Sequence, residues 1–259
     1  MLQEEVHKIL GKMTPITLKE MKTIRLMDRI DSKYVASDSL LPQLLEDILP
    51  YYRVQVNNNN RISPYCTQYL DTPDLDMFVM HQNGKLNRQK IRIRSYMDSE
   101  ISFLEVKNKN NKGRTSKIRV PVNQSHIDSI EDLEQDQSFL EKNSMFDSSR
   151  LEPTLANNFQ RITLVDNNKT ERVTIDLNLS FRNYKTGEEQ MLENVMILEL
   201  KQEGGGHSHF RDALNHLRIK QLSFSKYCIG TVLTNANVKA NRFKRKCSLI
   251  NKLIQQNTL

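Results

Sequence analysis

The sequence predicts an α+β protein in which an antiparallel β-barrel encloses a cationic interior and helices pack on its outside. Several segments alternate charged and aliphatic residues with a period of two, which is typical of β-strands. Other segments have the apolar spacing of amphipathic helices, which need an apolar surface to cover. If these helices cover the aliphatic faces of the strands, the charged faces line the interior of a closed barrel.

Three consecutive segments between Asn87 and Val120 carry the strongest alternation. The cations of the first segment share one strand face; they are Arg88, Lys90, Arg92 and Arg94. The second segment places Glu105 beside Lys107 on its polar face, and the third contributes Lys117 and Arg119. Arginine presents a planar fork that suits phosphate oxygens. From these strands alone, a charged face that simply meets water remains an open alternative.

Composition fits a cytoplasmic protein with an anionic partner. The chain has 259 residues, a net charge of +7, 37% hydrophobic and 27% charged residues. The positive balance favours nucleic acid, a phosphate polymer, a nucleotide or a lipid headgroup. Cys66, Cys228 and Cys247 are odd in number and far apart, which argues against a disulfide framework or a zinc knuckle. We expect no signal peptide and no transmembrane segment, because apolar runs are short.

The remaining elements follow from periodicity and from turn signals. Ser37 or Asp38 can cap a helix, Asn83-Gly84 can end one, and the glycines 204–206 break the chain. Further strands are expected at 25–35, 51–56, 65–70, 154–165, 172–181 and 195–202. Helices are expected at 2–12, 38–48, 75–81, 125–145, 207–219, 225–233 and 242–256. We read residues 1–259 as one domain, with 1–15 as a mobile N-terminal helix and 240–259 as a basic C-terminal helix.

The charged strand faces also predict the kind of ligand. Enclosing many like charges is costly unless an anion neutralises them. The expected interior is therefore best explained by a long, multiply charged ligand.

Several short motifs occur in an order that resembles the VTC domain, which belongs to the triphosphate tunnel metalloenzymes together with the CYTH proteins. The similarity covers nearly the whole chain, from Arg29-Ile-Asp-Ser-Lys-Tyr-Val to Phe224-Ser-Lys-Tyr. The motifs between these ends are Tyr69-Leu-Asp-Thr-Pro-Asp, His81-Gln-Asn-Gly-Lys, Arg92-Ile-Arg, Phe103-Leu-Glu-Val-Lys, Gly113-Arg-Thr-Ser-Lys, Arg172-Val-Thr-Ile-Asp, Leu198-Glu-Leu-Lys and Ser223-Phe-Ser-Lys. CYTH triphosphatases typically begin Glu-x-Glu-x-Lys, and Arg29 departs from that pattern.

The resemblance implies an ATP-dependent polyphosphate polymerase that passes the γ-phosphate of ATP to a growing phosphate chain, assisted by Mn²⁺ or Mg²⁺. Glu199 resembles the metal-binding glutamate of the family. The residues that resemble its catalytic phosphate contacts are Lys33, Arg92, Arg94, Lys107, Lys117, Arg161 and Arg172. Those expected to bind substrate are Lys90, Arg119, Lys201, Ser225 and Lys226. The family can carry a lysine where this chain has Ser223, so one phosphate contact is expected to be missing.

Alternatives to these roles stay open. Glu199 can instead form a salt bridge to a neighbouring cation, and for Glu105 an orienting ion pair is the favoured interpretation. His81 is interpreted as a packing residue. His207, His209 and His216 suggest a metal site, but the adjacent glycines favour a flexible surface segment. Lys244–Lys246 form either a solvated helix face or a contact with anionic lipids or a membrane partner.

Two other functions compete with the polymerase. A metal-dependent inorganic or nucleoside triphosphatase would use the same residues, with water as the acceptor. A non-enzymatic polyanion or RNA-binding module would need more aromatic residues among the cations, so nucleic acid is not the expected partner. The expected partners are ATP and polyphosphate or triphosphate, and a separate membrane protein for product export. This expectation places the protein in the cytoplasm or at the cytosolic face of a membrane complex.

Overall fold

One eleven-stranded sheet forms the framework of the protein, as the alternating sequence requires. We describe it from a computed structural model, in which residues 2–24, 26, 29–123 and 134–255 are placed. Its main path runs in the order β2-β11-β9-β8-β4-β5-β6-β7, and all pairs along this path are antiparallel. The strands of this path are β2 (Arg29–Ser37), β4 (Ser63–Asp71), β5 (Arg88–Tyr96), β6 (Ile101–Lys109), β7 (Thr115–Val122), β8 (Glu152–Asp166), β9 (Glu171–Asn183) and β11 (Val195–Glu203).

The strand register places the charged residues together on one face. Residues directly opposite each other in an antiparallel pair project from the same face. Glu199 of β11 is opposite Lys33 of β2, and Arg161 of β8 is opposite Asp176 of β9. Near the other end of the strand order, Glu105 of β6 is opposite both Arg92 of β5 and Arg119 of β7. The charged faces therefore form one continuous surface across the sheet.

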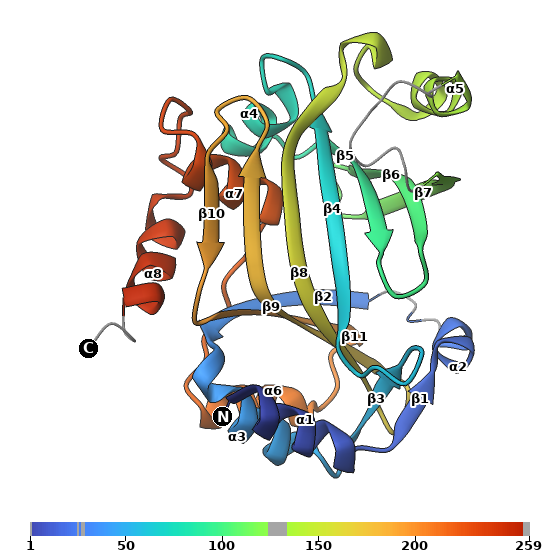
Figure 1. The fold of residues 1–259 in the computed structure, drawn as a ribbon, viewed down its shortest axis with the longest axis vertical. Coiled ribbons are helices and arrows are strands. Elements are labelled where there is room, and N and C mark those ends of the chain that lie inside the picture. Colours follow the sequence, from blue (N-terminus) through green and yellow to red (C-terminus); the bar gives the residue numbers. More distant parts are fainter. Residues whose placement is uncertain (1, 25, 27–28, 124–133, 256–259) are drawn as a thin grey trace.

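Helices cover much of the opposite, aliphatic face. One buried cluster joins outward residues of β2, β8, β9 and β11 to α1 (Leu2–Lys12), α3 (Leu41–Ile48) and α6 (His209–His216). These three helices lie together below the sheet in Figure 1. The expected placement of the helices on the aliphatic face is thus confirmed for this half of the sheet. The N-terminal helix, which we had expected to be mobile, buries Val6, Ile9 and Leu10 in this cluster.

A second buried cluster involves the other helices. It includes residues of α4 (Asp76–Gln82), α5 (Glu134–Asn143), α7 (Lys226–Thr234) and α8 (Lys244–Gln255). Helix α7 packs against β8 and β9. Gly230 permits this close approach, because a Cβ atom there would overlap the side chains of Phe181 and Leu155. Packing against these strands brings Ser225 and Lys226, at the start of α7, to the charged face.

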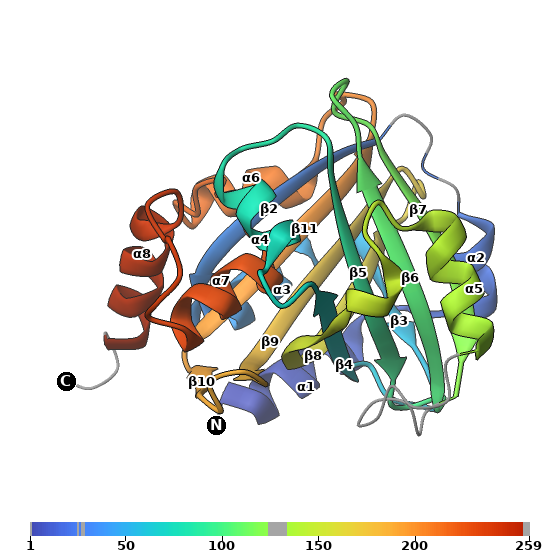
Figure 2. The ribbon, with the colours of Figure 1, turned by 90° about the horizontal axis from the view of Figure 1, so that it is seen from above.

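The sheet is strongly curled but does not close into a barrel, which corrects our expectation of a closed one. Figures 1 and 2 show β5, β6 and β7 turning toward β2 on the other side of the curl. The described strands β2 and β7 are the ends of the hydrogen-bonded path and do not pair. Part of the free edge of β2 is occupied instead, since Leu222 N donates to Lys33 O at 2.8 Å and Tyr34 bridges Gln221.

Short elements were not predicted from sequence. They are β1 (Pro15–Thr17), α2 (Leu18–Thr23) and β10 (Glu189–Leu192), together with the single helical turn η3 (Ser148–Arg150). The helix predicted at 38–48 begins with one tighter turn, η1 (Asp38–Leu40), which leads into α3. The other short strand, β3 (Tyr52–Val56), was predicted and pairs with β1 and β8. The helix expected at 125–145 is described only from Glu134 onward, and residues 124–133 lie outside the described part. Among the described helices, none has the length and apolarity needed to cross a membrane.

Candidate functional site

Three carboxylates, each held by two cations, organise the charged face. The first is Glu105, whose side chain is 1% exposed. Arg92 donates from Nε and Nη2 to its Oε2 at 2.8 and 2.6 Å, and Lys117 Nζ donates to Oε1 at 2.9 Å. Burial alone would raise the pKa of Glu105, but the charges of Arg92 and Arg94 and the bond from Lys117 outweigh it and lower the pKa to about 2. Glu105 is thus an ionised partner that fixes Arg92.

The second carboxylate is Asp176, which the sequence analysis did not single out. Arg161 donates to its two oxygens at 2.6 and 2.8 Å, in the bidentate geometry that holds a guanidinium rigidly. Lys226 Nζ, from the first turn of α7, lies 2.8 Å from Oδ2. Burial opposes ionisation of Asp176, yet Arg161 and Lys226 hold its pKa well below the ordinary range. Asp176 therefore ties the start of α7 to the sheet.

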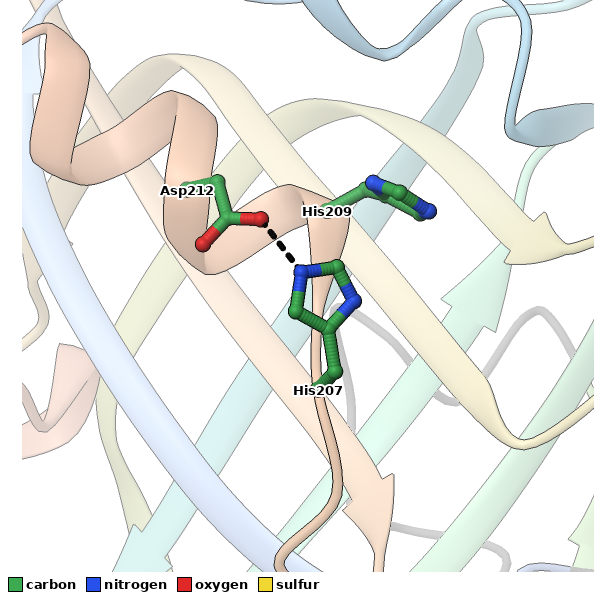
Figure 3. A group of neighbouring side chains, drawn as sticks. All are labelled: His207, His209 and Asp212. Atoms are coloured by element: carbon green, nitrogen blue, oxygen red, sulfur yellow. Dashed lines mark ion pairs between the residues drawn. The ribbon is translucent and has the colours of Figure 1, made fainter.

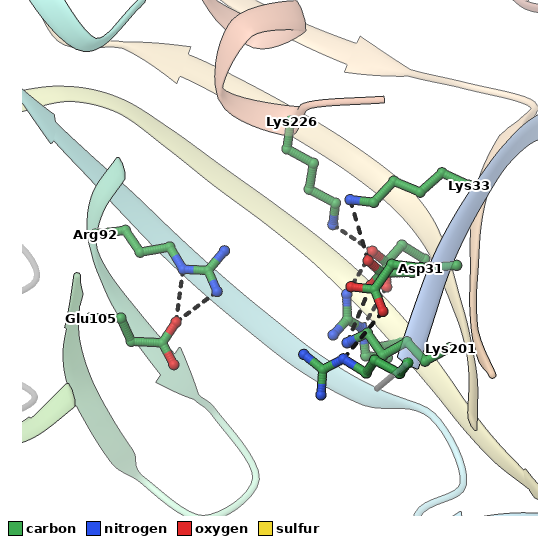
Figure 4. Close-up of polar contacts among 10 residues, drawn as sticks. Asp31, Lys33, Arg92, Glu105, Lys201 and Lys226 are labelled. Atoms are coloured by element: carbon green, nitrogen blue, oxygen red, sulfur yellow. Dashed lines mark hydrogen bonds and ion pairs between the residues drawn. The ribbon is translucent and has the colours of Figure 1, made fainter. Parts of the chain in front are cut away.

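The third carboxylate, Glu199, lies between two lysines. Its oxygens are 3.4 Å from Lys33 Nζ and 3.5 Å from Lys201 Nζ. Despite burial, the charges of Lys33 and Lys201 hold the pKa of Glu199 well below its usual value. Figure 4 shows Lys33, Lys201 and Lys226 converging from one side, with the Arg92–Glu105 pair across from them.

Electrostatic coupling links the two sides of the curled sheet. Burial, followed by the charges of Lys33 and Arg92, lowers the pKa of Lys107 to about 8. Burial, followed by Arg92 and Arg161, lowers the pKa of Arg94 to about 10. Lys107 of β6 thus lies near Lys33 of β2, and Arg94 of β5 lies near Arg161 of β8. These cations face one another and not separate regions of solvent. The arrangement concentrates positive charge in one place.

Aromatic rings support the cations beside Asp176. Lys226 Nζ lies 2.8 Å from the centroid of the Phe159 ring. The guanidinium of Arg161 lies 5.1 Å from the ring centroids of both Tyr65 and Phe159, and that of Arg94 lies 5.9 Å from each of them. A cation gains energy over a ring face, more so when water is excluded. Phe159 and Tyr65 thus help to position these charges.

The other predicted residues are placed as follows. Lys90 Nζ donates to Ser225 Oγ at 2.8 Å, and Ser225 also caps α7. Arg119 stacks on Phe103 at 4.2 Å on the exposed edge strand β7. Arg172 is turned aside, because its Nη2 donates to the carbonyls of Met21 and Ile24 at the end of α2. Except for Arg172, the residues proposed from sequence are thus gathered at the charged face.

The carboxylate oxygens of Glu199 fit a divalent ion that is bound jointly with phosphates. Mg²⁺ and similar ions bind through one or two carboxylates, water and substrate phosphates, without needing an all-protein cage. Glu199 is ionised and offers such a carboxylate. Within the described ranges, the one group of at least three close potential ligands lies elsewhere: atoms of His207, His209 and Asp212 are all within 4.8 Å of one another.

That histidine group belongs to the outer side of the sheet. Figure 3 shows His207 pointing at Asp212. His207 Nε2 lies 2.8 Å from Asp212 Oδ2, and the ring of His209 stacks on that of Tyr51. His216, which we had grouped with the other histidines, pairs with Asp47 instead. These contacts occur on α6 and just before it, and α6 packs on the aliphatic face. The group is therefore separate from Glu199.

The chain matches the profile of a known protein family. The profile of the VTC domain matches residues 28–235, which is most of the chain. This chain belongs to the VTC domain family. The match includes most of the residues described at the charged face and ends before α8. The family that the motifs predicted is thus confirmed.

Several solved structures are similar to this VTC domain at low sequence identity. A Bacillus halodurans protein provisionally called an adenylate cyclase is 14% identical, with 84% of this chain and 99% of that chain covered and a TM-score of 0.48. HpAC1 of Hippeastrum, reported to have a dominant triphosphatase activity, is 12% identical, with coverage of 80% and 96% and a TM-score of 0.48. PH1819 of Pyrococcus horikoshii is 14% identical, with coverage of 79% and 98% and a TM-score of 0.42. No curated protein matches the chain by sequence.

Proposed function

We propose that this VTC domain is an ATP-dependent polyphosphate polymerase. The observation that carries the proposal is the convergence of cations from β2, β5, β6, β8 and α7 around three carboxylates that are already paired. Cations exceed carboxylates there, so the face retains charge for a polyanion. Phosphoryl transfer depends mainly on positioning and on charge neutralisation, which such a face supplies.

In the proposed reaction, a terminal oxygen of the growing phosphate chain attacks the γ-phosphorus of ATP. The new P–O bond forms as the bond between the γ-phosphorus and the β,γ-bridging oxygen breaks, and ADP leaves with that electron pair. Arg92 and Arg161 are held by their carboxylates and so bind phosphate oxygens with little reorganisation. Lys33, Lys107 and Lys226 neutralise the charge of the transferring group.

A divalent ion, Mn²⁺ or Mg²⁺, would be held by Glu199 together with phosphate oxygens and would add further charge neutralisation. The role of the protein at this point is to keep the Glu199 carboxylate ionised and available. Lys33 and Lys201 do so by lowering its pKa. Both lysines are also close enough to contact the same phosphates.

The aromatic residues argue against an RNA-binding module. Binding of single strands uses exposed aromatic faces on which bases stack. Phe159 is 2% exposed, Tyr65 is 9% exposed, and both rings lie under cations. These rings thus offer no open stacking surface, whereas the cations suit a ligand made of phosphates alone.

The test is to incubate the protein with ATP and Mn²⁺ and to separate the products by gel electrophoresis, with ADP and phosphate measured in parallel. We expect a ladder of polyphosphate and one ADP for each phosphate added. Arg94→Met serves as the inactive control. Release of inorganic phosphate without any polymer would replace the polymerase with a triphosphatase, and no ATP consumption would reject both.

A further inference from the structure

A second group of cations lies where the start of α8 meets α4 and β5. The Arg242 guanidinium packs directly on Gly84, where a Cβ atom would overlap its Nη1 and Cζ atoms. Arg88, at the first position of β5, donates from Nη1 to the carbonyl of Lys85 at 2.8 Å. Lys246 Nζ, in the first turn of α8, donates to Ser223 Oγ at 2.7 Å. Arg88 and Lys246 are thus held by neutral acceptors, and Arg242 packs against a glycine.

Lys90 connects this group to the charged face. Its Nζ donates to Ser225 Oγ, two residues from Ser223, and its pKa is lowered to about 8 by burial and by the charges of Lys33 and Arg88. One half-buried imidazole, that of His81, lies close to all of these cations. The pKa of His81 falls to about 2, first through burial and then through Lys90, Arg88, Lys246 and Arg242. The positive charge therefore continues from the sheet onto α8.

This group has no compensating carboxylates among the described residues. None of the ion pairs of the described chain includes Arg88, Lys90, Arg242 or Lys246. The sequence itself has no aspartate or glutamate after Asp212. Uncompensated charge of one sign attracts a polyanion and raises its local concentration. The cations around Glu105 and Asp176, in contrast, have carboxylate partners.

We propose that this group binds a linear polyphosphate segment beyond the charged face of the sheet, so that a chain longer than triphosphate also contacts α8. The contact residues are Arg88, Lys90, Ser223, Ser225, Arg242 and Lys246. The inference rests on the proposed function, and it extends that function to residues of α8 that lie beyond the family match at 28–235. A nucleic acid suits this surface less well, because Phe243 at its centre is 1% exposed and offers no stacking face.

The experiment compares two ligands, tripolyphosphate and long-chain inorganic polyphosphate, on the full chain by calorimetry. The double variant Arg242→Gln/Lys246→Gln removes two cations that are not part of the proposed catalytic face. We expect its affinity for tripolyphosphate to stay within about twofold, while affinity for the long chain falls about tenfold. The salt dependence of long-chain binding should also become shallower, because fewer counterions are released.

A matched variant, Lys8→Gln/Lys12→Gln on α1, removes the same charge from a helix on the aliphatic face and should leave both affinities unchanged. Unchanged tripolyphosphate binding shows that the α8 variant is folded. The inference is rejected if the α8 variant binds the long chain as the parent does, or if both ligands weaken equally. Failure of the parent to bind tripolyphosphate at all would reject the proposed function itself, which is a distinct result.

Discussion

Lys226 and Asp176 form the contact that joins α7 to the sheet: Nζ of Lys226 lies 2.8 Å from Oδ2 of Asp176. The two side chains are 10% and 5% exposed. The same carboxylate also holds Arg161. One buried aspartate therefore sets the positions of two cations from different elements, so that Asp176 acts on phosphate binding through its neighbours.

The first prediction concerns the loss of this carboxylate. Asp176→Asn keeps the shape but leaves Arg161 and Lys226 close together with no neutralising partner. Breaking a buried ion pair from one side costs about 3–5 kcal/mol. We expect the free energy of unfolding, measured in urea, to fall by about that amount, and tripolyphosphate to restore a large part of it.

The control for Asp176 is an exposed ion pair. Asp74→Asn breaks the contact with Arg150, in which the side chains are 74% and 51% exposed. Exposed pairs contribute at most about 1 kcal/mol, so little change is expected. Equal losses in the two variants would contradict the role assigned to Asp176.

The second prediction separates Arg94 from Arg92. Arg94 has no ion pair among the described residues, and burial, followed by the charges of Arg92 and Arg161, lowers its pKa to about 10. We expect Arg94→Met to leave the free energy of unfolding unchanged or higher while ATP turnover falls by at least about a hundredfold, since aligned donors of this kind are worth several kcal/mol in a transition state.

Arg92→Met should differ, because it removes the bidentate partner of buried Glu105. We expect both stability and turnover to fall. Urea unfolding and an ADP assay on the two variants make the comparison. A stable Arg92→Met protein, or an active Arg94→Met protein, would show that the paired and unpaired arginines are not distinguished as we describe.

Much of this arrangement could be predicted from sequence, because strand periodicity is local. The alternation around Arg92 and Glu105 gave both the strands and the shared face, and the register places the two residues opposite each other. The contact between Asp176 and Lys226 could not be predicted in this way, since it depends on how α7 folds back onto β9. The contact of Phe159 with the cations could not be predicted from strand alternation either. The β8–β9 register shifts between Asn158 and Gln160, so the period of two is interrupted at Phe159.

The closure of the barrel was predicted wrongly for a related reason. Closure requires that the first and last strands of the path meet, and no local pattern encodes that distance. Residues 221–222 instead bond to β2. Short elements such as β1 and α2 carry too few residues for a period to be recognised.

The third prediction concerns pH. The pKa of Lys90 and of Lys107 is lowered to about 8 from 10.5, so the unfolded chain binds more protons than the folded one between these values. The free energy of unfolding of the ligand-free protein should therefore rise with pH across this window. Bound phosphates favour the charged form of both lysines. The affinity for such a ligand should therefore fall as the pH rises.

We expect tripolyphosphate affinity to fall by about tenfold per lysine between about pH 7 and about pH 9. Above its lowered pKa, each lysine of the ligand-free protein is mostly neutral and must take up a proton before it binds phosphate. Lys107→Arg keeps its charge at both values and serves as the control. Calorimetry on the two proteins should show a smaller loss for the variant. The same pH dependence in both would remove Lys107 from the phosphate site.

The fourth prediction concerns stabilisation by anions. An excess of cations repels itself when no ligand is present, and a ligand that binds only the folded state adds about 2.7 kcal/mol at a hundredfold excess over Kd. Tripolyphosphate should raise Tm much more than sodium chloride at equal ionic strength. Equal shifts from both would indicate general screening of charge and no defined site.

The last prediction tests Glu199 as the metal-binding residue. Its carboxylate lies 3.4 Å from Lys33 Nζ and 3.5 Å from Lys201 Nζ, and without a metal it would repel the phosphates that these lysines attract. Glu199→Gln keeps the shape, removes that repulsion and frees both lysines. We therefore expect binding of metal-free tripolyphosphate to be kept or strengthened, while polyphosphate synthesis and its dependence on Mn²⁺ are lost. Glu203→Gln, at the exposed end of the same strand, is the matched control and should behave as the parent. Calorimetry with and without Mn²⁺, beside the polyphosphate assay, distinguishes the two roles open to Glu199: a Gln variant that synthesises polyphosphate at the parent rate would make Glu199 a structural partner of Lys33 and Lys201.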